Sequence, residues 1–165
     1  MNHLIISFIT ADRPGIVDTL SNVINKHQGN WQKSSLQQMS GIFAGVVEIA
    51  CASEHIQALS NELAGLENFK MQIEHVAHAD IAPQTQVVLE LTANDRAGIV
   101  QEISSTIHHK GGNLLKLVST QESAPHAGHK LFKAKVTIAV NGADIDHLID
   151  ALEHLADDLM VDISR

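Results

Sequence analysis

The residues best placed to do chemistry lie in two short turns that share one sequence pattern. Residues 12–17 are Asp-Arg-Pro-Gly-Ile-Val, and residues 95–100, 83 positions further on, are Asp-Arg-Ala-Gly-Ile-Val. In each turn an aspartate and an arginine precede a glycine, and a helical pattern begins directly after it. A free helix N-terminus offers backbone N–H groups to a carboxylate, and the aspartate can meet an ammonium group. This combination suits a free α-amino acid, whose two opposite charges lie close together.

A second repeated pair adds an amide at the same offset. Gly29-Asn30 returns as Gly112-Asn113, and an asparagine side chain can donate or accept a hydrogen bond. We expect the strand-to-helix turn and the start of the next strand to lie near one end of the sheet. The candidate ligand-binding residues are therefore the aspartates, arginines and glycines of the turns and the two asparagines, namely Asp12, Arg13, Gly15, Asn30, Asp95, Arg96, Gly98 and Asn113.

Each of these residues also has a common structural role. The aspartates can cap helices, the glycines permit a tight turn into a helix, and the asparagines can end helices in the left-handed conformation. The arginines can be carboxylate partners or simply solvated. The second turn has Ala97 where the first has Pro14, and Asn94 precedes its aspartate, which predicts a wider turn and unequal sites. Recurrence of the whole set is what favours a ligand.

The elements around the turns follow the same order in both halves. Apolar spacing predicts strand, helix, a hairpin of two strands, helix and strand. In the first half these elements are residues 3–9, 16–27, 31–38, 43–51, 56–66 and 69–76, and in the second 86–91, 99–109, 114–121, 131–140, 145–155 and 159–163. Two interleaved βαβ crossovers give an α+β fold of two ferredoxin-like βαββαβ domains. Each is an antiparallel sheet with two helices on one face, so the other face is bare and must find a partner.

The repeat also sets the domain boundaries. We predict domains at residues 1–78 and 86–165, joined by a linker at 79–85 that contains Pro83. Beyond the hairpin the offset grows from 83 to 89, which places six extra residues in the loop at 122–129 of the second copy. Insertions are tolerated in such loops, and this one could serve a partner contact.

Charge and composition argue against nucleic acid and membranes as partners. The net charge is −8, with 4 Lys/Arg and 8 Asp/Glu in residues 1–82 and 7 and 11 in residues 83–165, so each half is −4. Lys130, Lys133 and Lys135 follow one strand, which we interpret as a solvated or edge strand. The apolar runs are too short to cross a membrane. No secretory leader is evident, and the single cysteine, Cys51, fits a reducing compartment, so we expect a cytoplasmic protein.

Catalytic and metal-binding patterns are weak. The 11 histidines give only pairs, such as His75 with His78 or His126 with His129, and no pair recurs between the copies. A metal site needs three or four convergent ligands, so we predict no metal and no cofactor. Cys51 is interpreted as a small core residue. No nucleophile elbow, phosphate loop or dinucleotide motif is present, and we predict no catalytic residues.

At this point a family resemblance becomes visible. Residues 10–17, a helix and then Gly29-Asn30 resemble the ACT domain, a small amino-acid-sensing regulatory module. The tandem pair without an attached catalytic domain resembles the glycine cleavage system transcriptional repressor family. The resemblance implies an effector, often an amino acid, bound at an interface between ACT domains. It assigns ligand contacts to the first turn and to the asparagine that opens strand two, here Asp12, Gly15 and Asn30, and Asp95, Gly98 and Asn113.

The resemblance also implies a function. We expect a non-enzymatic regulator in which glycine or a related amino acid changes binding to a DNA-binding transcription activator of glycine cleavage genes, so that repression is indirect. A homodimer through sheets or helices is possible in such a module. Two alternatives remain: a detached regulatory subunit that controls an amino-acid metabolic enzyme, and a small enzyme or metal carrier on the same scaffold, since a fold does not fix a function.

Overall fold

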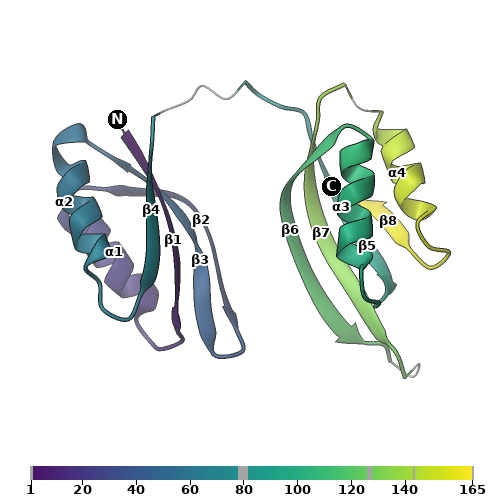
Figure 1. Cartoon of the computed structure of the whole chain (residues 1–165), viewed down its shortest axis with the longest axis horizontal. Helices are drawn as coiled ribbons and strands as arrows, with labels where there is room; N and C mark the ends of the chain where they lie inside the picture. The colour runs from purple at the N-terminus through teal and green to yellow at the C-terminus, as the bar shows by residue number, and fades with distance from the viewer. Residues whose placement is uncertain (1, 78–81, 126–127, 143, 165) are drawn as a thin grey trace. The chain divides into compact units, whose positions relative to one another are not determined.

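The computed structural model describes residues 2–77, 82–125, 128–142 and 144–164. The chain divides into two compact units, residues 1–81 and 82–165 (Figure 1). The end of the predicted first domain at residue 78 and positions 79–81 of the predicted linker lie outside the described residues, and residues 82–85 form neither helix nor strand.

The first unit has the predicted βαββαβ order. Its elements are β1 (Asn2–Ala11), α1 (Ile16–Lys26), β2 (Asn30–Met39), β3 (Ile42–Cys51), α2 (Ser53–Ala64) and β4 (Lys70–Val76). The strands form one antiparallel sheet in the order β2-β3-β1-β4. Figure 1 shows α1 and α2 on the same side of this sheet.

The second unit repeats the arrangement. Its elements are β5 (Gln86–Asn94), α3 (Ile99–His109), β6 (Gly112–Ser123), β7 (Lys130–Val140), α4 (Ile145–Glu153) and β8 (Met160–Ile163). The sheet order is β6-β7-β5-β8, again antiparallel. The predicted fold class is confirmed. None of the helices in the described part of the chain is long and apolar enough to span a membrane.

Alternating apolar residues explain why one face of each sheet carries the helices. In β1 every second side chain is buried, including Leu4, Ile6 and Phe8, while α1 buries the stripe that contains Leu20 and Ile24. A strand has a side-chain period of two and a helix one of 3.6, so both patterns place their apolar residues on one face. Each unit therefore has its own core, made only of its own residues.

The repeated Gly-Asn pairs do not end α1 and α3 in the predicted way. The left-handed residue after each helix is Gln28 (φ 57°) in the first copy and Gly111 (φ 78°) in the second. Gly29 and Gly112 are required for space instead. A Cβ on Gly112 would lie 2.9 Å from the Ile138 side chain, and one on Gly29 would lie 3.0 Å from the Ile24 side chain. These glycines let the end of the helix approach the sheet closely.

The lysine-rich strand is not an edge strand. Lys130, Lys133 and Lys135 lie on β7, which has a neighbour on both sides. The lysines are exposed, and two of them pair with acidic residues: the Lys133 Nζ lies 2.8 Å from the Glu122 carboxylate, and the Lys135 Nζ lies 3.8 Å from that of Glu90. Of the two interpretations, the edge strand is wrong, whereas the solvated strand agrees with the exposed lysines, because an inner strand can have one exposed face.

Candidate functional site

The strand-to-helix turn has the same geometry in both units. Gly15 (φ 87°) and Gly98 (φ 88°) each occupy the residue directly before a helix in the left-handed conformation, which glycine adopts without the steric cost of a Cβ. The backbone N–H of Asp12 donates to the Gly41 carbonyl at 2.8 Å, and that of Asp95 donates to the Lys130 carbonyl at 2.9 Å. The prediction of a wider second turn is wrong, since strand end and glycine are separated by the same number of residues in both copies.

The N-termini of α1 and α3 have no side-chain cap. Asp12 and Asp95 do not cap these helices, because the N-cap positions are Gly15 and Gly98. By contrast, Asp144 caps α4 by accepting two backbone N–H bonds. α2 also starts without a side-chain cap, so the lack of a cap alone does not mark a site. What distinguishes α1 and α3 is the left-handed glycine with an aspartate beside it.

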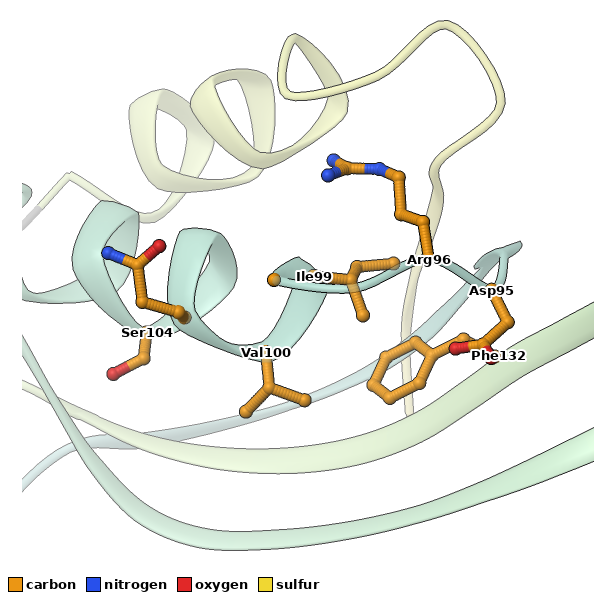
Figure 2. A pocket seen from close by; sticks show the side chains of 8 residues that line it. Asp95, Arg96, Ile99, Val100, Ser104 and Phe132 are labelled. Carbon is orange, nitrogen blue, oxygen red and sulfur yellow. The ribbon is translucent and has the colours of Figure 1, made fainter.

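An open depression lies at each of these two helix starts. The first has a volume of about 340 Å³ and is lined by Asp12, Arg13, Gly15, Ile16, Val17, Asp18 and Phe43. The second has a volume of about 530 Å³ and is lined by Asp95, Arg96, Gly98, Ile99, Val100, Gln101, Ser104 and Phe132 (Figure 2). Three of the four predicted residues of each unit therefore lie around one depression.

Both depressions have an apolar wall that was not predicted. Val17 and Val100 occupy matching positions and are 44% and 42% exposed, which is high for valine. Phe43 and Phe132 contribute from the strands β3 and β7. The signal was present in the sequence, since the valine is part of the repeated turn and the two phenylalanines match across the repeat. An apolar wall beside polar backbone groups is typical of small-molecule sites.

Arg13 is turned back onto its own strand. Its Nη1 donates to the Thr10 hydroxyl at 2.9 Å, and its guanidinium carbon lies 5.2 Å from the centre of the Phe69 ring. Thr10 is buried and donates in turn to the Asn68 carbonyl at 2.7 Å. A guanidinium over an aromatic face is favourable. Arg13 thus has partners within its unit that compete with a ligand.

Arg96 is held by a carboxylate of α3. Its two terminal nitrogens donate to the two oxygens of Glu102 at 2.7 and 2.5 Å. Such a two-point ion pair raises the pKa of Arg96 and lowers the pKa of Glu102. Figure 2 shows the Arg96 side chain turned away from Phe132 and Val100. The guanidinium therefore borders the depression without pointing into it.

Asp95 also has a partner, whereas none is found for the Asp12 side chain within the described residues. The Asp95 carboxylate accepts a short hydrogen bond from the Gln121 side-chain amide, and Lys130 Nζ donates to the other end of that amide at 3.0 Å. Both Gln121 and Lys130 lie on the hairpin of β6 and β7. The two depressions therefore differ in their aspartates: the carboxylate of the second is already hydrogen-bonded within its unit, and that of the first has no partner among the described residues.

The structure does not bring the asparagines to the turns of their own unit. Asn30 pairs with Ala50, whereas Ala11, just before Asp12, pairs with Ile42. Ile42 and Ala50 are eight residues apart on β3, which corresponds to about 26 Å of strand. Asn113 is displaced in the same way, because it pairs with Ala139 while Asn94 pairs with Leu131. The expectation that turn and asparagine share one end of the sheet is wrong.

Other reactive groups have structural explanations. Cys51 is buried in the first core and donates its Sγ–H to the His27 carbonyl at 3.6 Å; burial raises the pKa of its thiol, which disfavours the nucleophilic thiolate. Within the described ranges, no three His, Cys, Asp or Glu side chains are grouped as a metal would require. Residues 78 and 126, members of the histidine pairs in the sequence, lie outside those ranges.

Comparisons with known proteins identify the fold. No family model matches the chain, and no curated protein matches it. Among solved structures it is similar to an unknown protein from Galdieria sulphuraria, with 22% identity, a TM-score of 0.78 and coverage of 99% of this chain and 98% of that chain. It is also similar to a candidate glycine cleavage system transcriptional repressor, with 16% identity, a TM-score of 0.69 and coverage of 99% and 96%.

Single units also have solved neighbours. The ACT domain from GTP pyrophosphokinase of Chlorobium tepidum covers 45% of this chain and 96% of its own length at 20% identity, with a TM-score of 0.36. The two structures that match over nearly the whole chain, with TM-scores of 0.78 and 0.69, show the fold. The chain is a tandem of two ferredoxin-like domains. Over nearly its whole length it has the same tandem fold as the candidate glycine cleavage repressor.

Proposed function

We propose that the protein is a non-enzymatic regulator that responds to an amino acid, with glycine as the first candidate effector. The observation that carries this proposal is the pair of matching depressions at the starts of α1 and α3. Each combines uncapped helix N–H groups, which favour a carboxylate, with an aspartate that can receive an ammonium group. The ACT-like turn sequences and the fold shared with the candidate repressor support it.

The first depression is the better candidate for binding. No partner for the Asp12 side chain is found among the described residues, whereas Asp95 accepts a hydrogen bond from Gln121. Arg13 and Arg96 belong to the proposed sites as residues that border the ligand. Asn30 and Asn113 each lie far from the turn of their own unit, so neither contacts a ligand that is held by that turn alone.

We propose that the regulator acts through a protein partner, a DNA-binding activator of glycine cleavage genes, and represses transcription indirectly in the cytoplasm. A net charge of −8 does not favour direct contact with nucleic acid. An effector changes partner binding only through its different affinities for two states of the regulator. Such coupling is typically about 1–3 kcal/mol, or about 5- to 150-fold in affinity.

Thermal unfolding of the full chain with each of the twenty amino acids tests the effector. A ligand that binds only the folded state at about 100 times its Kd stabilises it by about 2.7 kcal/mol. We expect glycine or a related amino acid to raise the midpoint, and Asp12→Ala to remove most of the shift. Asp146→Ala, at the capped start of α4, is the matched control and should leave the shift intact. If no amino acid raises the midpoint, the proposal fails.

Recovery of bound proteins from a native extract, with and without the effector, tests the partner. A transcription activator whose recovery changes with the amino acid supports the proposal. Recovery of an amino-acid metabolic enzyme instead would identify the protein as a detached regulatory subunit, which the same two depressions would serve.

A further inference from the structure

The helix-free face of the first sheet has an apolar middle. Side chains of directly paired residues in antiparallel strands lie on the same face, so the register places Ile9, Ala44, Val46 and Ile42 together here, with Met39 at the edge. Ile9 and Val46 are each 46% exposed, Ile42 is 39% exposed and Met39 is 61% exposed. We call this surface the open face of the first sheet. A contiguous exposed apolar patch of this kind marks an interaction site.

The equivalent face of the second sheet is charged in its middle. The repeat aligns Ser7 with Glu90 and Val46 with Lys135, and the register agrees, because Ser7 pairs with Val46 as Glu90 pairs with Lys135. Ala44 likewise corresponds to Lys133. The same fold thus accepts either set of residues, so the apolar set is not needed for folding. The exposed apolar side chains favour protein cover for the first face over the second.

We propose that the open face of the first sheet binds the same face of a second copy, which makes the protein a twofold dimer. The two edge strands of this face carry opposite charges, so each edge of one copy can pair with the other edge of a second copy. Lys33 on β2 and Glu74 on β4 lie in one row across the sheet, connected through Glu48 and Ile5. A twofold axis parallel to the strands lays β2 of one copy over β4 of the other. Lys33 of each copy then faces Glu74 of the other, and two ion pairs flank the apolar middle.

The shape of the face fits the same axis. A depression of about 520 Å³ lies between β1 and β4 and is lined in part by Ser7, Ile9, Lys70 and Gln72. The axis that lays β2 over β4 also lays β3 over β1. It therefore brings the exposed Val46 of one copy, which is in the same row as Ser7, against this depression in the other.

The size of the face is sufficient for a dimer. Four strands about 4.8 Å apart and about nine residues long at about 3.3 Å per residue give a plane of roughly 19 by 30 Å. Side chains make the accessible area larger than the roughly 570 Å² of this plane. It therefore approaches the roughly 800 Å² that each partner buries in a standard interface.

The charged second sheet of another copy is a poorer occupant. Glu90, Lys133 and Lys135 would have to leave water and meet Ile9 and Val46, which offer no partner for a charge. Removing ions from water without such compensation is unfavourable. The inner strands of the first sheet place one carboxylate on this face, that of Glu48, which lies 3.0 Å from the His3 ring. Two identical first sheets therefore bring fewer charges into the middle of the interface.

Sedimentation equilibrium of the full chain tests the dimer. The double variant Ser7→Glu with Val46→Lys copies the residues of the second sheet into the first, so the fold should remain while dimerisation weakens at least about 100-fold, because charges at an apolar interface lose their hydration. Val118→Lys, an exposed valine on the same face of the second sheet, is the matched control and should leave the dimer unchanged. Far-UV circular dichroism verifies that the variants fold.

Charge reversal tests the predicted axis. Lys33→Glu alone and Glu74→Lys alone should each weaken the dimer about tenfold, because like charges then face each other twice. An equimolar mixture of the two variants should form heterodimers, since opposite charges then face each other at both positions: one ion pair keeps its original sign and the other is reversed. If the mixture gains nothing over the single variants, the axis is wrong and the proposal fails.

Two other outcomes overturn the proposal. Interfaces of this size bind between micromolar and picomolar, so a wild-type chain that stays monomeric at about 100 µM excludes it. A dimer that survives Ser7→Glu with Val46→Lys uses another surface. The proposal does not involve the turns at α1 and α3, so loss of an amino-acid response leaves it intact, and its failure leaves the proposed effector sites intact.

Discussion

At the scale of single residues, the two arginines show how neighbours set the direction of a side chain. Arg13 is held by Thr10 and Arg96 by Glu102. The residue that matches Thr10 in the second copy is Ala93, which has no hydroxyl, and the residue that matches Glu102 in the first copy is Thr19, which has no charge. Each copy therefore directs its arginine away from the depression by a different interaction. The polar groups left for a ligand are the backbone N–H groups and an aspartate.

The Arg96–Glu102 pair predicts a pH-dependent contribution to stability. The guanidinium holds the pKa of Glu102 below its usual range. Because the pKa is lower in the folded than in the unfolded chain, the pair's contribution is complete above the unfolded value of about 4.3 and is lost as the pH falls through the folded value. Glu102→Gln should therefore lower the unfolding midpoint at neutral pH. This difference should shrink and vanish in acid, where wild-type Glu102 is also uncharged.

Arg96→Gln provides the control for this prediction, because it removes the other half of the same pair. It should give the same pH-dependent difference, and the double variant should lose little more than either single variant. Urea unfolding between pH 7 and pH 3 measures all four proteins. A Glu102→Gln difference that stays constant down to pH 3 would show that the pair is not the cause.

The sequence predicted which residues surround the site but not how they are used. Gly15 and Gly98 could be placed at helix starts because a left-handed residue before a helix favours glycine. The aspartates were expected as possible caps, yet the capping position falls three residues later, on the glycines. The Gln121 bond to Asp95 comes from the distant β6–β7 hairpin. Such contacts depend on register, which local patterns do not contain.

At the scale of elements, the C-terminus of α1 contains strain that the second copy avoids. Gln28 adopts a left-handed backbone (φ 57°), and the matching residue in the second copy is Gly111. The left-handed conformation destabilises a residue that has a side chain by about 1–2 kcal/mol. Glycine avoids this cost but lowers the stability by about 0.4–1 kcal/mol, because it gives the unfolded chain more conformational entropy. We predict that Gln28→Gly stabilises the first unit by about 0.5–1 kcal/mol, measured by urea unfolding.

Gln57→Gly is the matched control, since it makes the same replacement within the helix α2. There the residue is in the right-handed conformation, and glycine should destabilise by about 1 kcal/mol. Opposite signs for the two variants would attribute the gain to the left-handed backbone. A loss at both positions would mean that Gln28 has contacts that outweigh its strain.

The position of the asparagines illustrates a limit at this scale. All twelve helices and strands predicted from apolar spacing are found, with ends that differ by a few residues. The prediction that Asn30 and Asn113 lie at the same end of the sheet as the turns was nevertheless wrong. A helix in a βαβ unit runs back along the sheet, so the strand that follows it starts where the first strand started. The helices and strands were predictable from local periodicity. The end of the sheet at which each strand begins follows only from the path of the chain through the fold.

At the scale of the whole molecule, duplication has kept the fold and changed the surfaces. The two cores contain matching apolar residues, such as Ile24 and Ile107 in α1 and α3, both 1% exposed. The helix-free faces differ at matching positions, with Val46 in one and Lys135 in the other. Substitutions inside a packed core are costly, whereas those on a sheet face are limited mainly by what covers it. The two copies can thus serve different contacts on one scaffold.

Separate cores predict that a core change destabilises only the unit that contains it. Ile24→Val and Ile107→Val each remove one buried methylene from matching places, which should cost about 0.5–1.5 kcal/mol. Trp31, the single tryptophan, packs against the first core and reports that unit alone. Ile24→Val should lower the urea midpoint seen by Trp31 fluorescence. Ile107→Val should leave that midpoint unchanged while lowering the transition seen by circular dichroism. If both variants shift the Trp31 signal equally, the two units unfold as one cooperative body and their cores do not act separately.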